Sequence, residues 1–295
     1  MTSPARTATV LADGLSFGEG PRWRDGRLWF SDFYDHAVKS VTAAGDVRVE
    51  FEMDDQPSGL GWLPDGDLLV VSMTRRRLLR RGADGRLTTH ADLSGIATWH
   101  CNDMTVDAAG RAYVGNFGLD LDAAVADRGF AGVIAEHATA KLALVEANGA
   151  VRVAAEDMHF PNGTAITPDG KTLIIGETLA MRLTAFDIGA DGALSNRREW
   201  APLGARVPDG ICLDVEGAVW VANPGAPECV RVAEGGEVLE VVETSLPCYA
   251  CMLGGEGGRT LFMMTSRPAT ADEADGKPRG RIETVGAPAA HAGRP

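Results

Sequence analysis

The sequence predicts an all-β protein, a six-bladed β-propeller with four-stranded antiparallel blades. A segment with the same layout recurs six times along the 295 residues, and each copy turns on a glycine that is followed by a short run of β-forming residues. Repeats of roughly 40 to 50 residues that each supply about four short strands are typical of propeller blades. Because the repeats run through the chain, we expect residues 1–295 to form a single domain.

The copies share the spacing between their first residue and their turn glycine, which is eight positions in five copies and seven in the first. The turns read Asp-Gly, Ala-Gly or Glu-Gly, and such pairs supply the positive φ that tight hairpins require. The copies are EGPRWRDGRLWFSD from Glu19, SGLGWLPDGDLLVVS from Ser58, NDMTVDAAGRAYVGN from Asn102, NGTAITPDGKTLIIGE from Asn162, DGICLDVEGAVWVAN from Asp209 and YACMLGGEGGRTLFMMT from Tyr249.

Three segments lie outside this pattern. The third unit is longer than the others, and its excess, Leu119 to Ala140, reads as a loop that covers the mouth of the central tunnel. No long segment keeps the 3.6-residue apolar period of a helix. Near the end, Pro268 to Arg279 reads as a polar loop before a last strand, Arg281 to Val285, and residues 286–295 read as a mobile tail.

Composition narrows the classes of partner. The formal net charge is −13, which disfavours nucleic acid because its phosphates require clustered lysine and arginine. No signal peptide or membrane span is evident, and five cysteines at irregular spacing disfavour a disulfide framework, so we expect a cytoplasmic protein. Cys248 and Cys251 have redox spacing but no strand-to-helix context, and are interpreted as ordinary strand cysteines.

The repeat also predicts a site. The innermost strand of each propeller blade lines the central channel, so residues at equivalent positions meet around the axis. The first residues of the six copies are two carboxylates, two carboxamides, a hydroxyl and a phenol: Glu19, Ser58, Asn102, Asn162, Asp209 and Tyr249. One such residue alone is equally well explained as the end of a loop. Together they predict a cluster that needs a compensating charge.

A divalent cation supplies that charge, because every one of these side chains offers oxygen. Carboxylate and amide oxygens favour Ca²⁺, with Mg²⁺ and Mn²⁺ as alternatives. Zn²⁺ stays possible because His100 and Cys101 flank the ring, although neither is a member of it.

At these residues the chain resembles the regucalcin, gluconolactonase and luciferin-regenerating enzyme (SMP-30-like) family from about Leu15 to Val285. The motifs are Glu19-Gly-Pro-Arg-Trp, Asn102-Asp103 followed by Val106-Asp107-x-x-Gly-Arg111, Phe160-Pro-Asn162-Gly with Pro168-Asp-Gly, and Pro208-Asp209-Gly. The resemblance implies that Glu19, Asn162 and Asp209 bind the metal.

The same resemblance implies substrate contacts at Asn102 and Asp103. His100 stands where sugar-lactone members carry an arginine that holds substrate hydroxyls, and a histidine offers fewer donors. This departure weighs against a polyhydroxylated sugar lactone. Trp62 and Trp99 are expected either to give the pocket an aromatic wall or to pack between blades.

The expected function is hydrolysis of a small lactone, a sugar lactone or a related cyclic ester, in which the metal polarises the carbonyl and a water attacks. The water is activated either by Asp209 as general base, the role that the resemblance also implies, or on the metal itself. No serine or cysteine nucleophile motif is evident. The alternatives are a hydrolase or lyase of another substrate on the same site, and a calcium-binding regulator without enzymatic activity.

Overall fold

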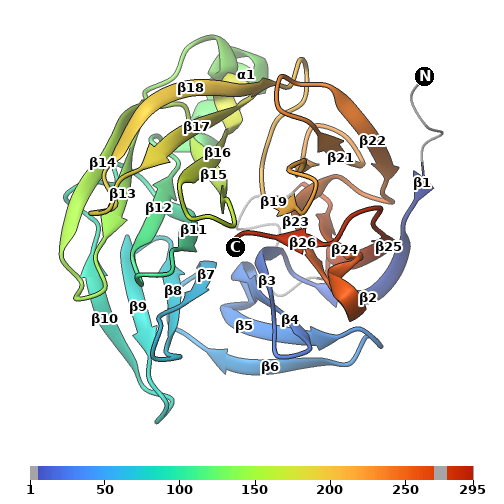
Figure 1. Cartoon of the computed structure of the whole chain (residues 1–295), viewed down its shortest axis with the longest axis horizontal. Coiled ribbons are helices and arrows are strands. Elements are labelled where there is room, and N and C mark those ends of the chain that lie inside the picture. The colour runs from blue at the N-terminus through green and yellow to red at the C-terminus, as the bar shows by residue number, and fades with distance from the viewer. Residues whose placement is uncertain (1–5, 269–277, 295) are drawn as a thin grey trace.

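Six β-sheets surround one axis in the computed structural model, which describes residues 6–268 and 278–294 (Figure 1). Each blade is built on four antiparallel strands, and two short strands, β1 (Arg6–Thr7) and β26 (His291–Ala292), extend one of the sheets at its edges; the predicted six-bladed propeller is therefore confirmed. The first three blades are β3 (Gly18–Arg24), β4 (Arg27–Asp32), β5 (Ala37–Thr42), β6 (Val47–Glu52); β7 (Pro57–Trp62), β8 (Leu68–Ser72), β9 (Arg77–Arg81), β10 (Leu87–Asp92); and β11 (Cys101–Val106), β12 (Ala112–Asn116), β13 (Ala140–Val145), β14 (Val151–Met158).

The fourth and fifth blades have the same order, and the sixth takes its outermost strand from the start of the chain. They are β15 (Pro161–Ile166), β16 (Thr172–Glu177), β17 (Arg182–Ile188), β18 (Leu194–Pro202); β19 (Ile211–Asp214), β20 (Val219–Asn223), β21 (Glu228–Val232), β22 (Val238–Glu243); and β23 (Cys248–Gly254), β24 (Thr260–Ser266), β25 (Gly280–Gly286), β2 (Thr9–Leu15). Because β2 pairs with β25, the two ends of the chain close the ring (Figure 1).

The innermost strands β3, β7, β11, β15, β19 and β23 contact one another in sequence, and β23 contacts β3 again. The turn glycines adopt the positive φ expected of them: Gly26 at 75°, Gly66 at 94°, Gly110 at 82°, Gly170 at 71°, Gly217 at 80° and Gly257 at 65°. Apolar residues of the strands fill the space between neighbouring sheets, so the core lies between the blades. Cys248 and Cys251 are free and buried there beside Cys212 and Cys229, as strand cysteines of the core.

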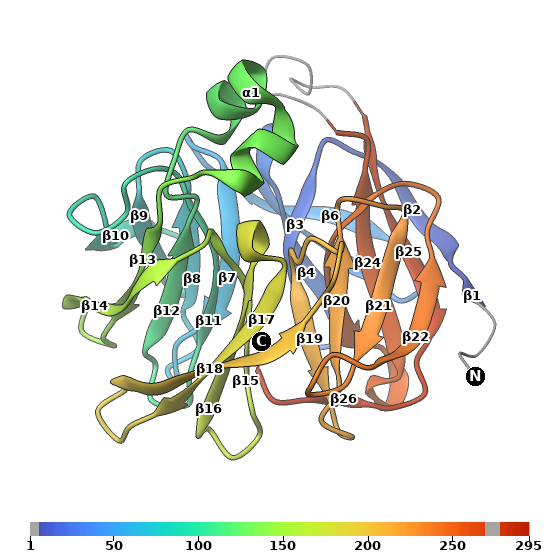
Figure 2. The same cartoon turned by 90° about the horizontal axis from the view of Figure 1, so that it is seen from above.

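The extra length of the third blade contains a helix that the sequence analysis did not predict. Helix α1 (Leu121–Ala135) begins at Asp120, whose carboxylate accepts a hydrogen bond from the backbone N–H of Ala123 at 3.0 Å. It stands over one end of the propeller, where the predicted loop was expected to cover the tunnel (Figure 2). The sequence of α1 has a weak apolar period, and in the structure Val133 is its one fully buried residue. Short 3₁₀ turns follow β4, β16 and β23: η1 (Phe33–Asp35), η2 (Thr178–Ala180) and η3 (Glu256–Gly258).

The expectation of a mobile tail over residues 286–295 is wrong for residues 286–294. Strand β26 (His291–Ala292) pairs with β19, and the backbone of Arg294 exchanges hydrogen bonds with that of Ile166. These bonds hold the C-terminal segment against the end of the propeller opposite α1 (Figure 2). The short β1 (Arg6–Thr7) adds in parallel to β22. Most of the predicted polar loop, residues 269–277, lies outside the described residues. Nowhere in the described chain is a helix both long and apolar enough to cross a membrane.

Candidate functional site

The first residues of the six repeats converge, as predicted. Glu19, Asn102, Asn162, Asp209 and Tyr249 line one central cavity of about 470 Å³ under α1. The sixth, Ser58, is buried behind them, and its hydroxyl donates to Oδ1 of Asn102 at 3.3 Å. These residues are far apart in the chain, and the propeller brings them to one place.

A break in strand pairing accompanies the ring residues. The pairing of the innermost strands with their neighbours shifts register next to Glu19, Ser58, Asn102, Asn162 and Tyr249. Such β-bulges turn a side chain away from its regular position in the strand. Asp209 differs, because it lies just before β19 begins at Ile211. The ring residue therefore lies at a bulge in five blades and before the strand in the fifth blade. In either place its side chain can face the axis, because it does not follow the regular alternation of a strand.

Glycine follows the ring residue in four of the six repeats, at Gly20, Gly59, Gly163 and Gly210. A Cβ atom at Gly163 would lie 2.3 Å from the backbone oxygen of Asp209, and one at Gly59 would lie 2.5 Å from the backbone nitrogen of Met104. Neighbouring inner strands therefore approach one another too closely for any side chain at these positions. Because the inner strands lie this close, the ring residues that they contribute also lie close to one another.

A chain of hydrogen bonds fixes the two amides. The Nδ2 of Asn102 donates to Oδ1 of Asn162 at 2.7 Å, and the Nδ2 of Asn162 donates to Oγ1 of Thr178 at 3.1 Å. Thr178 in turn donates to the backbone oxygen of Pro208 at 2.8 Å, so its hydroxyl must accept from Asn162. Asn162 also donates to the carboxylate of Asp209. The orientation of both amides is therefore set by their partners.

The carboxylates of the ring lie in an environment that disfavours their charge. Burial, reinforced by the charge of Asp103, raises the pKa of Asp209 to about 8, although a hydrogen bond from Asn162 opposes the rise. Burial raises the pKa of Glu19 well above its usual value too, and the charges of Asp209 and Asp103 add to this effect. Either a proton or a cation can offset the repulsion between these two buried carboxylates.

The donor set fits a hard divalent cation. Glu19 and Asp209 offer carboxylate oxygens, and Asn162 offers an amide oxygen that accepts a hydrogen bond from Asn102 and has a second lone pair. Within residues 6–268 and 278–294, no cluster of three or more His, Cys, Asp or Glu side chains is arranged to hold a metal. An ion at this site therefore depends on the amide oxygen as well as on the two carboxylates.

Asp103 takes a different place from the other predicted site residues. It occupies the position at which four other repeats have glycine, and it is absent from the residues that line the central cavity. Its carboxylate accepts from Nη2 of Arg22 at 2.7 Å, and both side chains are buried. Arg22 also donates to the backbone oxygens of Leu60 and Pro21. Asp103 thus contributes charge from behind the ring.

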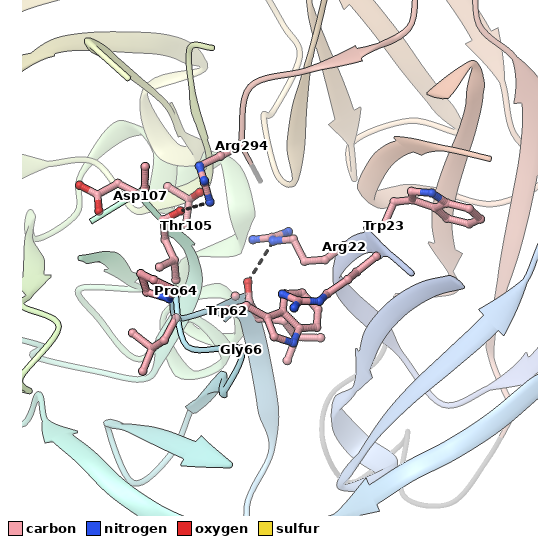
Figure 3. A pocket seen from close by; sticks show the side chains of 14 residues that line it. Arg22, Trp23, Trp62, Pro64, Gly66, Thr105, Asp107 and Arg294 are labelled. Atoms are coloured by element: carbon pink, nitrogen blue, oxygen red, sulfur yellow. Dashed lines mark hydrogen bonds between the residues drawn. The ribbon is translucent and has the colours of Figure 1, made fainter. Parts of the chain in front are cut away.

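Arg22 lines a second cavity of about 410 Å³, and it is not among the residues that line the central cavity. Figure 3 shows Arg22 in this second cavity together with Trp62, Thr105 and Arg294. Trp62 packs edge-on against Trp29 of the neighbouring blade, with ring centroids 5.6 Å apart. Of the two expectations for Trp62, the structure therefore supports packing between blades.

His100 lies beside the central cavity and does not line it. It belongs to an adjoining cavity of about 330 Å³ near the start of α1, where its ring stacks on Trp99 with centroids 5.1 Å apart. The two cavities share Phe117, Leu121 and Asp122. Burial lowers the pKa of His100, so its neutral form is favoured.

Sequence reasoning missed most of the wall of the central cavity. The residues two positions before the ring residues of three blades line it: Phe17, Phe160 and Val207. The same offset led to His100 in the third blade, so applying it to every repeat would have found these three. The side chains from α1 carried no such signal, because α1 is an insertion that no other repeat contains.

The raised pKa of Asp209 predicts how the stability of the metal-free protein depends on pH. A carboxyl that titrates near pH 8 when folded and near ~3.9 when unfolded binds a proton more tightly in the folded state. Its stabilising contribution is therefore complete below about pH 4 and is lost as the pH rises through about 8. In chelator at about pH 8.5, the Tm of Asp209→Asn should exceed that of the wild type by at least ~2 °C, and the gap should shrink toward pH 5. Thermal melts across this range check it, and equal Tm values throughout would contradict it.

Comparison with known proteins places the chain in a family. Residues 17–267 match the model of the SMP-30/gluconolactonase/LRE-like region. The chain is 26% identical over 273 residues to a regucalcin from Danio rerio, with 90% of this chain and 88% of the relative covered. It is 25% identical over 277 residues to an L-arabinolactonase from Azospirillum brasilense, with 92% of this chain and 88% of the relative covered.

A solved structure of a luciferin-regenerating enzyme has the same fold, with a TM-score of 0.77, 18% identity and 95% of each chain covered. The family match spans both the first and the last ring residue. The chain belongs to the SMP-30/gluconolactonase/LRE-like family.

Proposed function

We propose that this protein hydrolyses a lactone with the help of one divalent metal ion, most simply Ca²⁺. The observation that carries the proposal is the convergence of Glu19, Asn162 and Asp209 at the floor of one cavity, where burial raises the pKa of both carboxyls. The match to the L-arabinolactonase spans 88% of the length of that relative, which supports lactone hydrolysis as the reaction.

Glu19, Asn162 and Asp209 would hold the ion through their oxygens. When bound, the ion polarises the substrate carbonyl as a Lewis acid. Asp209, whose carboxylate lines the cavity, accepts the proton of the attacking water. The proton is then available for the alkoxide that leaves when the ring opens.

The remaining predicted residues take supporting roles in this proposal. Asn102 lines the cavity and, with its amide fixed by Ser58 and Asn162, orients the substrate carbonyl. Asp103 acts indirectly, because its charge raises the pKa of Asp209 and its carboxylate anchors Arg22. His100 lies in the adjoining cavity and would contact only a substituent that extends past Phe117.

A panel of lactones and simple esters, assayed with added Ca²⁺ or Mn²⁺ and with EDTA, tests the proposal. We expect turnover of at least one lactone that disappears with EDTA and returns with metal. Turnover that persists in EDTA would contradict the role of the ion. Tight metal binding without turnover of any ester would favour a calcium-binding regulator instead.

A further inference from the structure

The wall of the central cavity is far less polar than its floor. It is lined mainly by aromatic and aliphatic side chains, and all six blades contribute to them. They are Phe17, Phe33, Tyr34, Met73, Phe117, Leu121, Phe130, Phe160, Val207, Pro224, Tyr249 and Pro268. The volume of about 470 Å³ falls in the range of ~300–1,000 Å³ that accommodates drug-sized ligands.

Two groups of aromatic rings form opposite sides of this wall. On one side, Phe17 lies with its ring centroid 4.6 Å from those of Phe33 and Tyr249, and Tyr34 adjoins Phe33 at 4.3 Å. Other rings, Phe117 and Phe160, lie 4.5 Å apart and pack with the underside of α1. Rings in such tilted and edge-on arrangements hold one another in place, so the wall is formed before a ligand arrives.

Eight of the described residues that line the cavity carry a polar group, and several of these have a proposed or structural partner already. The full set is Glu19, Tyr34, Asn102, Asp122, Asn162, Thr178, Asp209 and Tyr249. Glu19, Asn162 and Asp209 are the proposed metal ligands, and the hydroxyl of Thr178 is used by Pro208 and Asn162. No lysine, arginine or histidine is found among the described residues that line the cavity. A sugar lactone would bring several hydroxyl groups against phenyl rings, and each buried hydroxyl without a partner is penalised strongly.

We propose that the substrate is a lactone whose ring carries an aromatic or branched apolar substituent and few or no hydroxyl groups. This inference rests on the proposed function and adds the substrate class to it. The ester group lies at the polar floor, where Asn102 orients the carbonyl, and the substituent fills the space between the two groups of rings. Hydrophobic burial of the substituent supplies most of the binding energy.

Helix α1 completes the apolar end of the site. Leu121 and Phe130 face the cavity from α1, and Phe130 is 38% exposed. An exposed phenylalanine at the rim of a cavity is covered when an apolar substituent lies beneath it. Gly129, immediately before it, has a φ of 69° inside the helix, which aims the ring differently from a regular helical position.

Matched γ-lactones test this substrate class in metal-loaded protein. γ-Phenyl-γ-butyrolactone and L-arabinono-1,4-lactone share the ring and differ in the substituents. After division by the hydroxide-catalysed rate of each, we expect kcat/KM to favour the phenyl lactone by at least ~100-fold. Equal or reversed preference would overturn the inference and leave the proposed function intact. Failure to hydrolyse either lactone, or any other ester, would overturn both.

Variants of the wall provide the second part of the test. Phe33→Ala and Phe130→Ala remove rings that are at least partly exposed, so the fold should tolerate them. We expect kcat/KM for the phenyl lactone to fall ~5–20-fold, mainly through KM, with less than ~3-fold change for unsubstituted γ-butyrolactone. Phe51→Ala serves as the matched control. Phe51 is half-buried on β6 of the first blade, under the guanidinium of Arg81, and its replacement should leave kcat/KM for both substrates unchanged.

Binding without turnover gives an independent readout. Asp209→Asn should bind the phenyl lactone in calorimetry, and Phe130→Ala introduced into that variant should weaken binding by the same factor as it raises KM. If the wall variants lose kcat/KM equally for the phenyl lactone and for unsubstituted γ-butyrolactone, the rings support the fold and do not bind the substituent. That result would contradict the inference.

Discussion

Replacing Asp209 with asparagine is expected to lower kcat for lactone hydrolysis by at least ~1,000-fold while the propeller stays folded. The carboxylate is buried at the central cavity, and this burial together with the charge of Asp103 raises its pKa to about 8 in the metal-free protein. An asparagine keeps the shape and the hydrogen bond to Asn162 but neither accepts a proton at neutral pH nor supplies a full charge to a metal.

Steady-state kinetics and circular dichroism on the same preparations measure this. Asp187→Asn is the matched control, because Asp187 is an exposed carboxylate that pairs with Arg198 on β17 and β18. The control should retain wild-type activity within ~2-fold. Activity of Asp209→Asn within ~3-fold of wild type would show that Asp209 neither moves a proton nor holds the ion.

Replacing Arg22 with methionine is expected to have the largest effect on stability, a loss of about 3–5 kcal/mol in the free energy of unfolding. Arg22 is buried, and its guanidinium bonds Asp103 and three backbone oxygens of the first three blades. Without it, the buried charge of Asp103 has no counter-charge, and Asp103 also adds to the repulsion on Glu19 and Asp209.

Chemical denaturation of single and double variants separates charge from packing. Arg22→Met combined with Asp103→Asn should recover at least ~1 kcal/mol, because both members of the pair are then neutral. Arg6→Met, which breaks the exposed pair with Glu240, should stay within about 1 kcal/mol of wild type. A loss below ~1 kcal/mol for Arg22→Met would contradict the view that Arg22 compensates the buried charge of Asp103.

The fold and the floor of the site were predictable because both follow from the repeat. The interval between Glu19 and Gly26, or between Asn162 and Gly170, fixes the inner hairpin of a blade, and closing six such hairpins in a ring brings their first residues together. The identities of the residues then suggest the chemistry, since side chains with oxygen atoms at equivalent positions have no structural reason to recur. This part of the account needed no packing detail.

Features outside the repeat were not predictable in the same way. The sequence of helix α1 contains many alanines and lacks a clear apolar stripe. In the structure, Val133 is its one completely buried residue. The segment around Ala292 consists mostly of alanine, glycine and proline, which carry no strand signal, and its pairing with β19 appears only in the structure. Asp103 looked like a substrate contact, yet its partner Arg22 comes from a different blade and is found only when the strands are placed.

The character of the cavity wall was foreseen only in part. His100 pointed away from sugar lactones, but the aromatic wall was sought at Trp62 and Trp99, which lie elsewhere. The rings that form the wall, such as Phe33 and Phe130, come from a 3₁₀ turn and from an inserted helix. Their place over the ring depends on how these connections fold back, which spacing along the chain does not encode.

The metal site itself is tested most directly by anomalous X-ray diffraction from crystals soaked in Mn²⁺. We expect one strong anomalous peak in the central cavity, within about 2.0–2.6 Å of an oxygen from each of Glu19, Asn162 and Asp209. A cavity that stays without anomalous density at saturating Mn²⁺, or a peak bound by other residues, would contradict the account.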